Sequence, residues 1–105
     1  MSTKERTPIP RRMRVGKRMY SVEVVEALID KNSMGRINYQ NRNIQIATHH
    51  SPGRKIAGAD IRDSFWHETI HAILHDMGKD NLNRDEAFVR GFASRLSHAI
   101  DTARF

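Results

Sequence analysis

Apolar residues recur at helical spacing through the second half of the chain. They stand at steps of four, three and four residues, at Trp66, Ile70, Ile73 and Met77. This period places them on one face of a helix. Asp60 is a suitable N-cap and Gly78 a suitable residue just beyond the C-terminal end, so the pattern predicts a helix over residues 60–77.

A second helix is predicted to begin near Arg84. Its apolar positions, which mark the face expected in the core, are Val89, Phe92, Ala93, Leu96 and Ile100. Earlier in the chain the period changes from helical to alternating, in residues 35–40 and 43–48, on either side of Asn41-Arg42. Alternation sends successive side chains to opposite faces of a sheet, so these residues predict a β-hairpin. Its buried face is expected to hold Ile37, Tyr39, Ile44 and Ile46.

The N-terminal part of the chain has weaker patterns. Residues 1–10, which contain Pro8 and Pro10, are predicted to be a flexible basic arm. Residues 12–22 can form a short hairpin around Gly16-Lys17, since apolar and charged residues alternate there.

Two further segments are assigned by their local sequence. Residues 21–31 carry apolar residues at helical spacing behind Ser21, a possible N-cap, and this favours a helix. The β-branched content of the same segment would also suit a continuing strand. Residues 49–55 are predicted to be a loop because they contain a Ser-Pro-Gly sequence.

The length of 105 residues is that of one domain with a single modest core. We therefore expect an α+β fold over residues 11–105, with a hairpin or short antiparallel sheet packed on the first helix and on the C-terminal helix. The chain has no cysteine, so imidazole and carboxylate groups are the available metal donors. No run approaches the roughly 18 apolar residues of a membrane span, and no secretory signal is evident, so a cytoplasmic location is expected.

The net charge of +6 is concentrated near the N-terminus. Glu5 is the only acidic residue among residues 1–20, whereas residues 21–105 carry acidic and basic residues in equal number. The basic residues of this leader are Lys4, Arg6, Arg11, Arg12, Arg14, Lys17 and Arg18. They can contact nucleic acid through its phosphates. A solvated tail is the simpler interpretation, because Tyr20 is the only aromatic residue among them and offers no stacking platform.

His67, Glu68 and His71 form the pattern His-Glu-x-x-His within the predicted helix. Four residues are about one helical turn, so both imidazoles project from the same face, close enough to bind one metal ion. The glutamate between them lies beside this position, where it can act as general base on a metal-bound water. The sequence therefore predicts half of a catalytic zinc site.

A third metal ligand must come from another element, since catalytic zinc normally takes three protein ligands. Glu86, three residues before Val89, falls on the buried side of the second helix. Asp85 remains a rival with a shorter side chain. His75 also continues the series 67, 71, 75, but three turns of a straight helix spread the outer residues roughly 12 Å apart along the axis. An acidic residue in a first turn can also simply complement the helix dipole.

The segments His67-Glu-Thr-Ile-His71, Gly78 and Asp85-Glu86-Ala-Phe-Val-Arg-Gly-Phe-Ala together resemble the gluzincin arrangement. In that arrangement, a glutamate from a following helix completes a His-Glu-x-x-His helix. The chain is most similar to the small, single-domain minigluzincins, zinc metallopeptidase-like proteins often encoded by phages and prophages. The resemblance extends from about Gly35 to Leu96 and would place a phage-encoded protein in the host cytoplasm.

This resemblance implies a zincin-like fold and a zinc peptidase acting on a peptide or protein. It implies His67, His71 and Glu86 as zinc ligands and Glu68 as general base. It further implies that residues 43–48 form the edge strand along which an extended substrate pairs. Larger gluzincins add a second domain and a separate His or Tyr that stabilises the oxyanion. The candidates for the oxyanion role in this chain are His49, His50, Tyr39 and His75.

Other interpretations of the same residues stay open. His67 and His71 can be helix-surface residues of a small interaction domain without metal. Zinc can instead stabilise a catalytically inactive interaction domain, which the basic N-terminus would bring to nucleic acid. Where the imidazoles do bind metal they must be neutral, so metal affinity is expected to fall as the pH drops below about 6.5.

Overall fold

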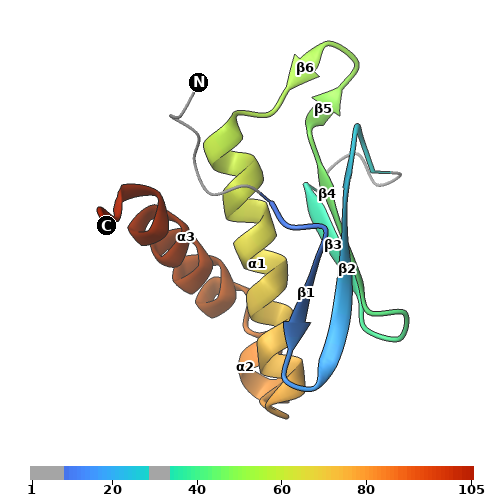
Figure 1. Cartoon of the computed structure of the whole chain (residues 1–105), viewed down its shortest axis with the longest axis vertical. Helices are drawn as coiled ribbons and strands as arrows, with labels where there is room; N and C mark the ends of the chain where they lie inside the picture. Colours follow the sequence, from blue (N-terminus) through green and yellow to red (C-terminus); the bar gives the residue numbers. More distant parts are fainter. Residues whose placement is uncertain (1–8, 29–33) are drawn as a thin grey trace.

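A four-stranded sheet lies along one side of a long central helix (Figure 1). The computed structural model describes residues 9–28 and 34–105. The strands of this sheet are β1 (Arg12–Val15), β2 (Arg18–Val25), β3 (Gly35–Asn38) and β4 (Asn43–Ala47). Their order is β1-β2-β4-β3, so β3 is an edge strand and β4 is internal. The chain has the α+β fold that the sequence predicts.

The helices are α1 (Gly58–Asp76), α2 (Asp80–Arg84) and α3 (Glu86–Thr102). In Figure 1, α1 runs through the middle of the molecule, with the sheet on one side and α3 on the other. The two predicted helices are confirmed as α1 and α3, and the short α2 between them was not anticipated. Gly78 follows α1 with a φ of 72°, a left-handed conformation that suits glycine at the end of a helix.

The hairpin β3–β4 is confirmed, with Ile37 opposite Ile44. The N-terminal hairpin β1–β2 is confirmed as well and turns at Gly16, which has a φ of 61°. The sheet is not purely antiparallel as expected, because β2 and β4 pair in parallel. β2 and β3 therefore lie on opposite sides of β4, with β2 parallel and β3 antiparallel to it.

The helix expected over residues 21–31 is wrong for the part that the structure describes. Ser21 to Val25 continue β2, and residues 29–31 lie outside the described residues. The β-branched Val22 is buried against α1 in this strand, and each residue from Ser21 to Val25 has a partner on β4. Pairing with β4 is a long-range interaction, which overrides a weak helical period.

The loop expected over residues 49–55 is also wrong. This segment forms a second small hairpin, β5 (His49–Ser51) and β6 (Arg54–Lys55). It turns around Gly53, whose φ is 77°, and it projects from one end of the molecule in Figure 1. Pro52 and Gly53 do form a turn, but the strands on either side of it are too short to show alternation.

The core has two main parts, one on each side of α1, and a third small cluster of Leu28, Ala47 and Ile56. Between the sheet and α1 the buried residues are Val15, Tyr20, Val22, Ile44, Ile46, Phe65 and Ala72. Between α1 and α3 they are Ile70, Leu74, Val89 and Ala93. Because α1 packs against the sheet on one side and against α3 on the other, the single apolar face predicted for this helix is only partly right. Ile73 and Met77, expected in the core, are 37% and 59% exposed, and Phe92 on α3 is 47% exposed.

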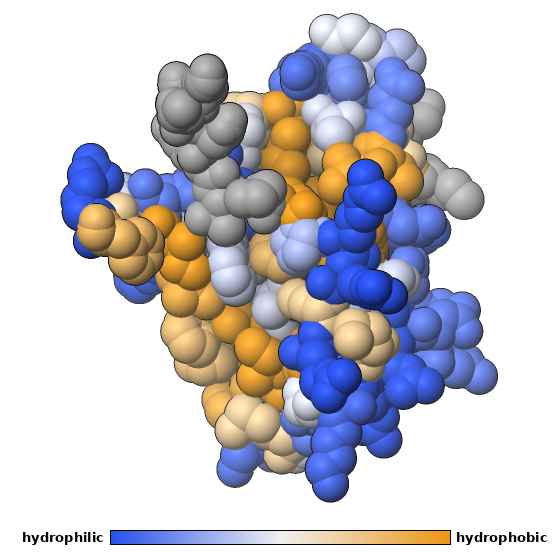
Figure 2. All heavy atoms as spheres, in the orientation of Figure 1, coloured by the Kyte–Doolittle hydropathy of each residue, from blue (hydrophilic) through white to orange (hydrophobic). Residues whose placement is uncertain are grey.

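Figure 2 shows the hydrophilic surface concentrated over the sheet side of the molecule and apolar surface along the α1 and α3 side. The leader cations within the described residues are exposed, namely Arg11, Arg12, Arg14, Lys17 and Arg18. Residues 1–8 of the predicted flexible arm, with Lys4 and Arg6, lie outside the described residues. Within the part of the chain that the structure describes, no helix has the length and apolar character needed to cross a membrane.

Candidate metal centre

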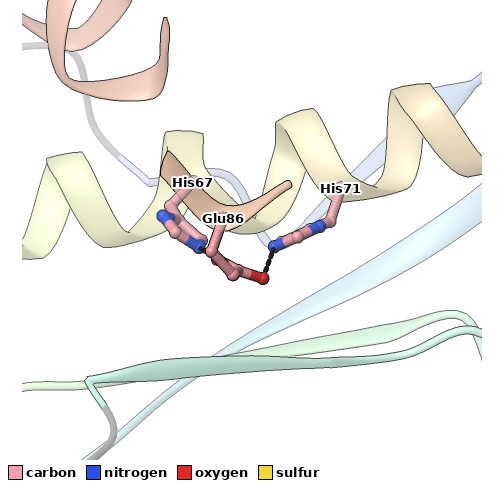
Figure 3. A group of neighbouring side chains, drawn as sticks. All are labelled: His67, His71 and Glu86. Atoms are coloured by element: carbon pink, nitrogen blue, oxygen red, sulfur yellow. Dashed lines mark ion pairs between the residues drawn. The ribbon is translucent and has the colours of Figure 1, made fainter. Parts of the chain in front are cut away.

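Three side chains from α1 and α3 converge on one point. His67 and His71 project from the same face of α1, and Glu86 reaches them from the first turn of α3 (Figure 3). One carboxylate oxygen of Glu86 lies 3.2 Å from Nε2 of His67, and the other lies 3.1 Å from Nε2 of His71. Ligand atoms of the three residues all fall within 4.8 Å of one another, so the group can hold a metal ion.

The donor set suits a tetrahedral ion. Bonds of about 2.0 to 2.2 Å to nitrogen and oxygen imply a separation of about 3.3 Å between neighbouring ligand atoms. The two contacts between Glu86 and the histidines lie close to this separation. Three protein donors leave a fourth position for water or substrate, and the Glu86 side chain is 53% exposed, so the site faces solvent on one side.

Glu86 is positioned by the way α3 begins. Asp85 is the N-cap, and its Oδ1 accepts a hydrogen bond of 3.1 Å from the backbone N–H of Phe88. This cap holds the Asp85 side chain at the helix end and leaves Glu86 as the first helical residue, beside α1. The geometry decides between these two candidate ligands, because Glu86 lies in the histidine cluster and Asp85 does not.

His75, the other candidate for the third ligand, also lies outside the cluster. Its ring stacks on Tyr39, with the ring centroids 4.3 Å apart. This matches the expectation that a third consecutive turn of a straight helix cannot converge on the same ion.

His71 is held by a residue that the sequence reasoning missed. Its Nδ1 lies 2.6 Å from Oδ1 of Asn83, on α2. An amide oxygen only accepts hydrogen bonds, so Nδ1 must carry the proton and Nε2 presents its lone pair toward Glu86 and the metal position. Asn83 in turn donates from Nδ2 to the hydroxyl oxygen of Tyr39, at 3.1 Å. The only sign of this role in the sequence is that Asn83 stands three residues before Glu86, the proposed ligand.

His67 is kept neutral by its surroundings. Burial lowers the pKa of its imidazole, and the neighbouring His71 lowers it further. A neutral imidazole is the form that binds a metal. Asp63, one turn earlier on α1, has a buried Oδ1 with no hydrogen-bond partner among the described residues. Burial raises the pKa of this carboxyl group, while His67 acts in the opposite direction.

Glu68 lies beside the cluster and is 7% exposed. Burial, with the nearby charge of Glu86, raises the pKa of its carboxyl group to about 7 in the metal-free protein. The edge strand comes very close to this side chain. A Cβ atom at Gly35 would stand 3.3 Å from both Cγ and Oε2 of Glu68, so glycine allows β3 to approach the carboxylate.

A cleft of about 710 Å³ opens over these residues. It lies between β3 on one side and the cluster on the other, and its lining includes Gly35, Ile37, Tyr39, Glu68, Arg84 and Glu86. Of the four oxyanion candidates, only Tyr39 lines this cleft. His75 lines a neighbouring cavity, and His49 and His50 belong to the β5 hairpin strand. Arg84, on α2, is a further cation of the cleft wall that sequence reasoning did not identify.

The strand expected to receive an extended peptide must be corrected. Residues 43–48 contain β4, which pairs with β2 on one side and β3 on the other and so offers no free edge. The edge strand beside the cleft is β3. The parallel pairing of β2 with β4, which the alternating pattern does not reveal, is the reason for the difference.

Comparison with known proteins gave no assignment. No protein-family model matches the chain, and neither the curated proteins nor the solved structures contain a significant match.

Proposed function

We propose that this chain is a zinc-dependent metallopeptidase of the minigluzincin type. The observation that carries the proposal is the convergence of His67, His71 and Glu86 within 4.8 Å, beside the buried carboxyl group of Glu68, in one cleft. Two imidazoles and one carboxylate, with no thiolate, match the ligand set of catalytic zinc in peptidases. In this proposal His67, His71 and Glu86 hold the zinc.

When bound, zinc would polarise the scissile carbonyl and lower the pKa of the attacking water toward 7. Glu68 takes a proton from that water as the water oxygen bonds to the carbonyl carbon. It then delivers this proton to the amide nitrogen as the carbon–nitrogen bond breaks. Its place one residue after His67, on the helix face that borders the cleft, keeps the carboxylate next to the reacting atoms.

Tyr39 is proposed to stabilise the negative charge that develops on the carbonyl oxygen. Its hydroxyl oxygen accepts a hydrogen bond from Asn83, so its own proton remains available to the cleft. Burial raises the pKa of this hydroxyl, which therefore stays protonated near neutral pH. Tyr39→Phe is expected to lower kcat about 10- to 100-fold with little change in zinc affinity.

An extended peptide is proposed to pair with β3. The strand is free on its outer side among the described residues, and it borders the cleft that contains the cluster. Main-chain hydrogen bonds to an edge strand bind peptides of varied sequence, while side-chain pockets provide specificity. Pairing with β3 would carry the scissile bond past Glu68, because Gly35 already approaches this carboxylate.

The experiment that tests the proposal combines metal analysis with cleavage of a peptide library. Protein purified without chelator is expected to contain about one zinc per chain, and the double variant His67→Ala/His71→Ala none. Zinc-loaded protein is expected to cleave library members, and Glu68→Gln is expected to keep its zinc while losing cleavage. Protein that neither contains nor takes up zinc would refute the proposal.

A structural zinc without catalysis is the second candidate function. The observation in its favour is that the ligands come from both α1 and α3, so an ion would join two helices of a small core. This alternative predicts that neither the wild-type chain nor Glu68→Gln cleaves any peptide of the library. Zinc at one per chain, with no cleavage across the library, would support it over the peptidase.

A further inference from the structure

A second cavity lies next to the metal cleft and shares Tyr39 with it. Its volume is about 410 Å³. It is lined by Arg18, Tyr20, Tyr39, Gln40, Arg42 and His75. These residues come from the start of β2, from the turn between β3 and β4, and from the last turn of α1. Tyr39 in the wall of this cavity is hydrogen-bonded to Asn83, and Asn83 is hydrogen-bonded to the proposed zinc ligand His71.

Two guanidinium groups of this cavity have no partner in the part of the chain that the structure describes. Among the described residues, no carboxylate lies within ion-pair distance of Arg18 or Arg42, and neither side chain makes a hydrogen bond. Asp76 is close enough to act electrostatically on Tyr20, but it does not line the cavity. The cavity therefore presents a net positive charge with open donor positions.

A buried tyrosine forms part of the same wall. Tyr20 is 2% exposed, and its ring packs in the core between the sheet and α1. Its hydroxyl makes no hydrogen bond to another described residue, and Tyr20 belongs to the lining of the cavity. A ligand in the cavity that accepts a hydrogen bond can therefore pair with this hydroxyl.

The backbone at Arg42 is unusual as well. Its φ is 54°, in the left-handed region that favours glycine, and it is the only non-glycine residue with positive φ among the described residues. An arginine at this turn position has a free-energy cost that glycine would avoid. Residues held in such conformations cluster at functional sites, and Arg42 lines the cavity.

We propose that this cavity is an anionic subsite that binds the carboxylate of an acidic side chain in the substrate. Arg18 and Arg42 bind the carboxylate oxygens, and the Tyr20 hydroxyl donates a further hydrogen bond. The inference rests on the proposed peptidase function, because a peptide that lies along β3 carries side chains into both cavities. A carboxylate is the anion that a peptide can supply, and paired arginines match its two oxygens.

The subsite lies at one end of the substrate path. The β3 strand runs from Gly35, beside Glu68, toward Tyr39, beside the subsite. A peptide added antiparallel to β3 would therefore place residues on the N-terminal side of its scissile bond toward Arg18 and Arg42. The proposal predicts a preference for Asp or Glu on that side and none on the C-terminal side.

The test uses zinc-loaded Glu68→Gln protein, which binds peptides without cleaving them. Fluorescein-labelled peptides that differ only by Glu or Gln at one scanned position are compared by fluorescence anisotropy. One N-terminal-side position is expected to favour Glu about tenfold. Adding Arg18→Ala or Arg42→Gly is expected to reduce the preference about threefold each, since both arginines are exposed and partly screened. Raising the salt concentration should weaken the preference.

The control variant is Arg12→Ala, which removes an exposed cation from β1 outside this cavity and should leave the preference unchanged. Arg42→Gly should fold at least as well as the parent, because glycine tolerates the positive φ, so loss of the preference would not reflect unfolding. Equal binding of Glu and Gln at every position would overturn the proposal. A preference found only on the C-terminal side would overturn it too.

A second measurement separates the subsite from the peptidase function. The arginine Nε–H resonances of the wild-type chain are followed by NMR during titration with N-acetyl-glutamate amide or N-acetyl-glutamine amide, in which the α-carboxyl group is blocked and only the side chain differs. Shifts at Arg18 and Arg42 with the glutamate alone would support the subsite even in a chain that binds no zinc. Absence of a selective shift, or tighter binding of inorganic phosphate at the same arginines, would overturn the assignment to a carboxylate.

Discussion

Asn83 shows how a single amide connects the proposed zinc ligands to the cleft wall. Its oxygen accepts from Nδ1 of His71, and its nitrogen donates to Tyr39. The first bond fixes the tautomer that a metal needs, and the second fixes the hydroxyl proposed to act on the substrate. Both ends of the amide are used, so its orientation is determined by its partners.

Removal of this amide should weaken metal binding without unfolding the chain. Asn83→Ala is expected to lower zinc affinity about 10- to 100-fold, because Nδ1 of His71 loses its acceptor. Competition with a chromophoric chelator measures the affinity. Asn83→Asp retains an acceptor at the same position and should restore most of it. Equal affinities for Asn83→Ala and the wild type would show that the contact does not orient His71.

Glu68 leads to a pH prediction for the metal-free protein. Its carboxyl pKa is about 7 in the folded chain and ordinarily 4.5, so between these values the folded state holds a proton that the unfolded state has lost. Stability therefore decreases as the pH rises through this window, by on the order of 3 kcal/mol from this group. Glu68→Gln lacks the ionisation and should be more stable than wild type at pH 8, with little difference near pH 4.5.

Urea denaturation of chelator-treated protein at several pH values measures this difference. Comparison of the variant with the wild type at each pH removes the contribution of the other titrating groups, including His67, whose pKa is lowered. A stability difference that does not grow between pH 5 and pH 8 would contradict the assigned burial of the Glu68 carboxyl group.

At the scale of elements, the start of α3 decides which carboxylate reaches α1. Asp85 caps the helix through Phe88, and Glu86 follows it into the cluster. The other end of the same helix is also tied to α1, where Arg62 contacts Asp101 at 2.9 Å in a largely buried ion pair. The two helices are thus connected by polar groups at both ends and by the apolar residues between them.

Asp85→Ala should separate capping from metal binding. The variant loses the hydrogen bond to the Phe88 amide and is expected to lose about 1 kcal/mol of stability. Zinc content should stay near one per chain, because Glu86 remains the ligand. The matched variant Glu86→Ala should give the opposite result, with zinc lost. Thermal unfolding and metal analysis of both proteins provide the test, and loss of zinc in Asp85→Ala would reinstate Asp85 as a ligand.

Some helices and strands were predicted correctly and others were not, and the difference has a physical reason. The β3–β4 hairpin and the helices α1 and α3 have periods that depend on local burial alone, and these were identified. The second half of β2, Ser21 to Val25, was assigned to a helix because its neighbour in the sheet is β4, which lies about twenty residues away and leaves no trace in the local period. The exposure of Met77 was likewise missed, since the position of α3 decides which side of α1 is covered.

At the scale of the whole molecule, the sequence predicted the parts of the candidate site whose placement follows from helix geometry. The spacing of His67 and His71 and the face of Glu86 follow from helical periods. Asn83 and Arg84 belong to a short helix without any period, so only the packing of this helix against α1 brings them to the cleft. The missed residues are therefore the ones that orient the ligands and shape the cleft.

The ligands of the proposed zinc come from two helices on opposite sides of a small interface, so metal binding should stabilise the entire fold. Zinc that binds only the folded chain adds about 2.7 kcal/mol at a free concentration one hundred times its Kd. For a domain of this size we expect Tm to rise roughly 10 to 20 °C above that of the chelated protein. His67→Ala, scanned in the same buffers by calorimetry, should show a much smaller rise. If zinc raised Tm equally in both proteins, the stabilising ion would have to bind elsewhere, and the link between α1 and α3 through Glu86 would be refuted.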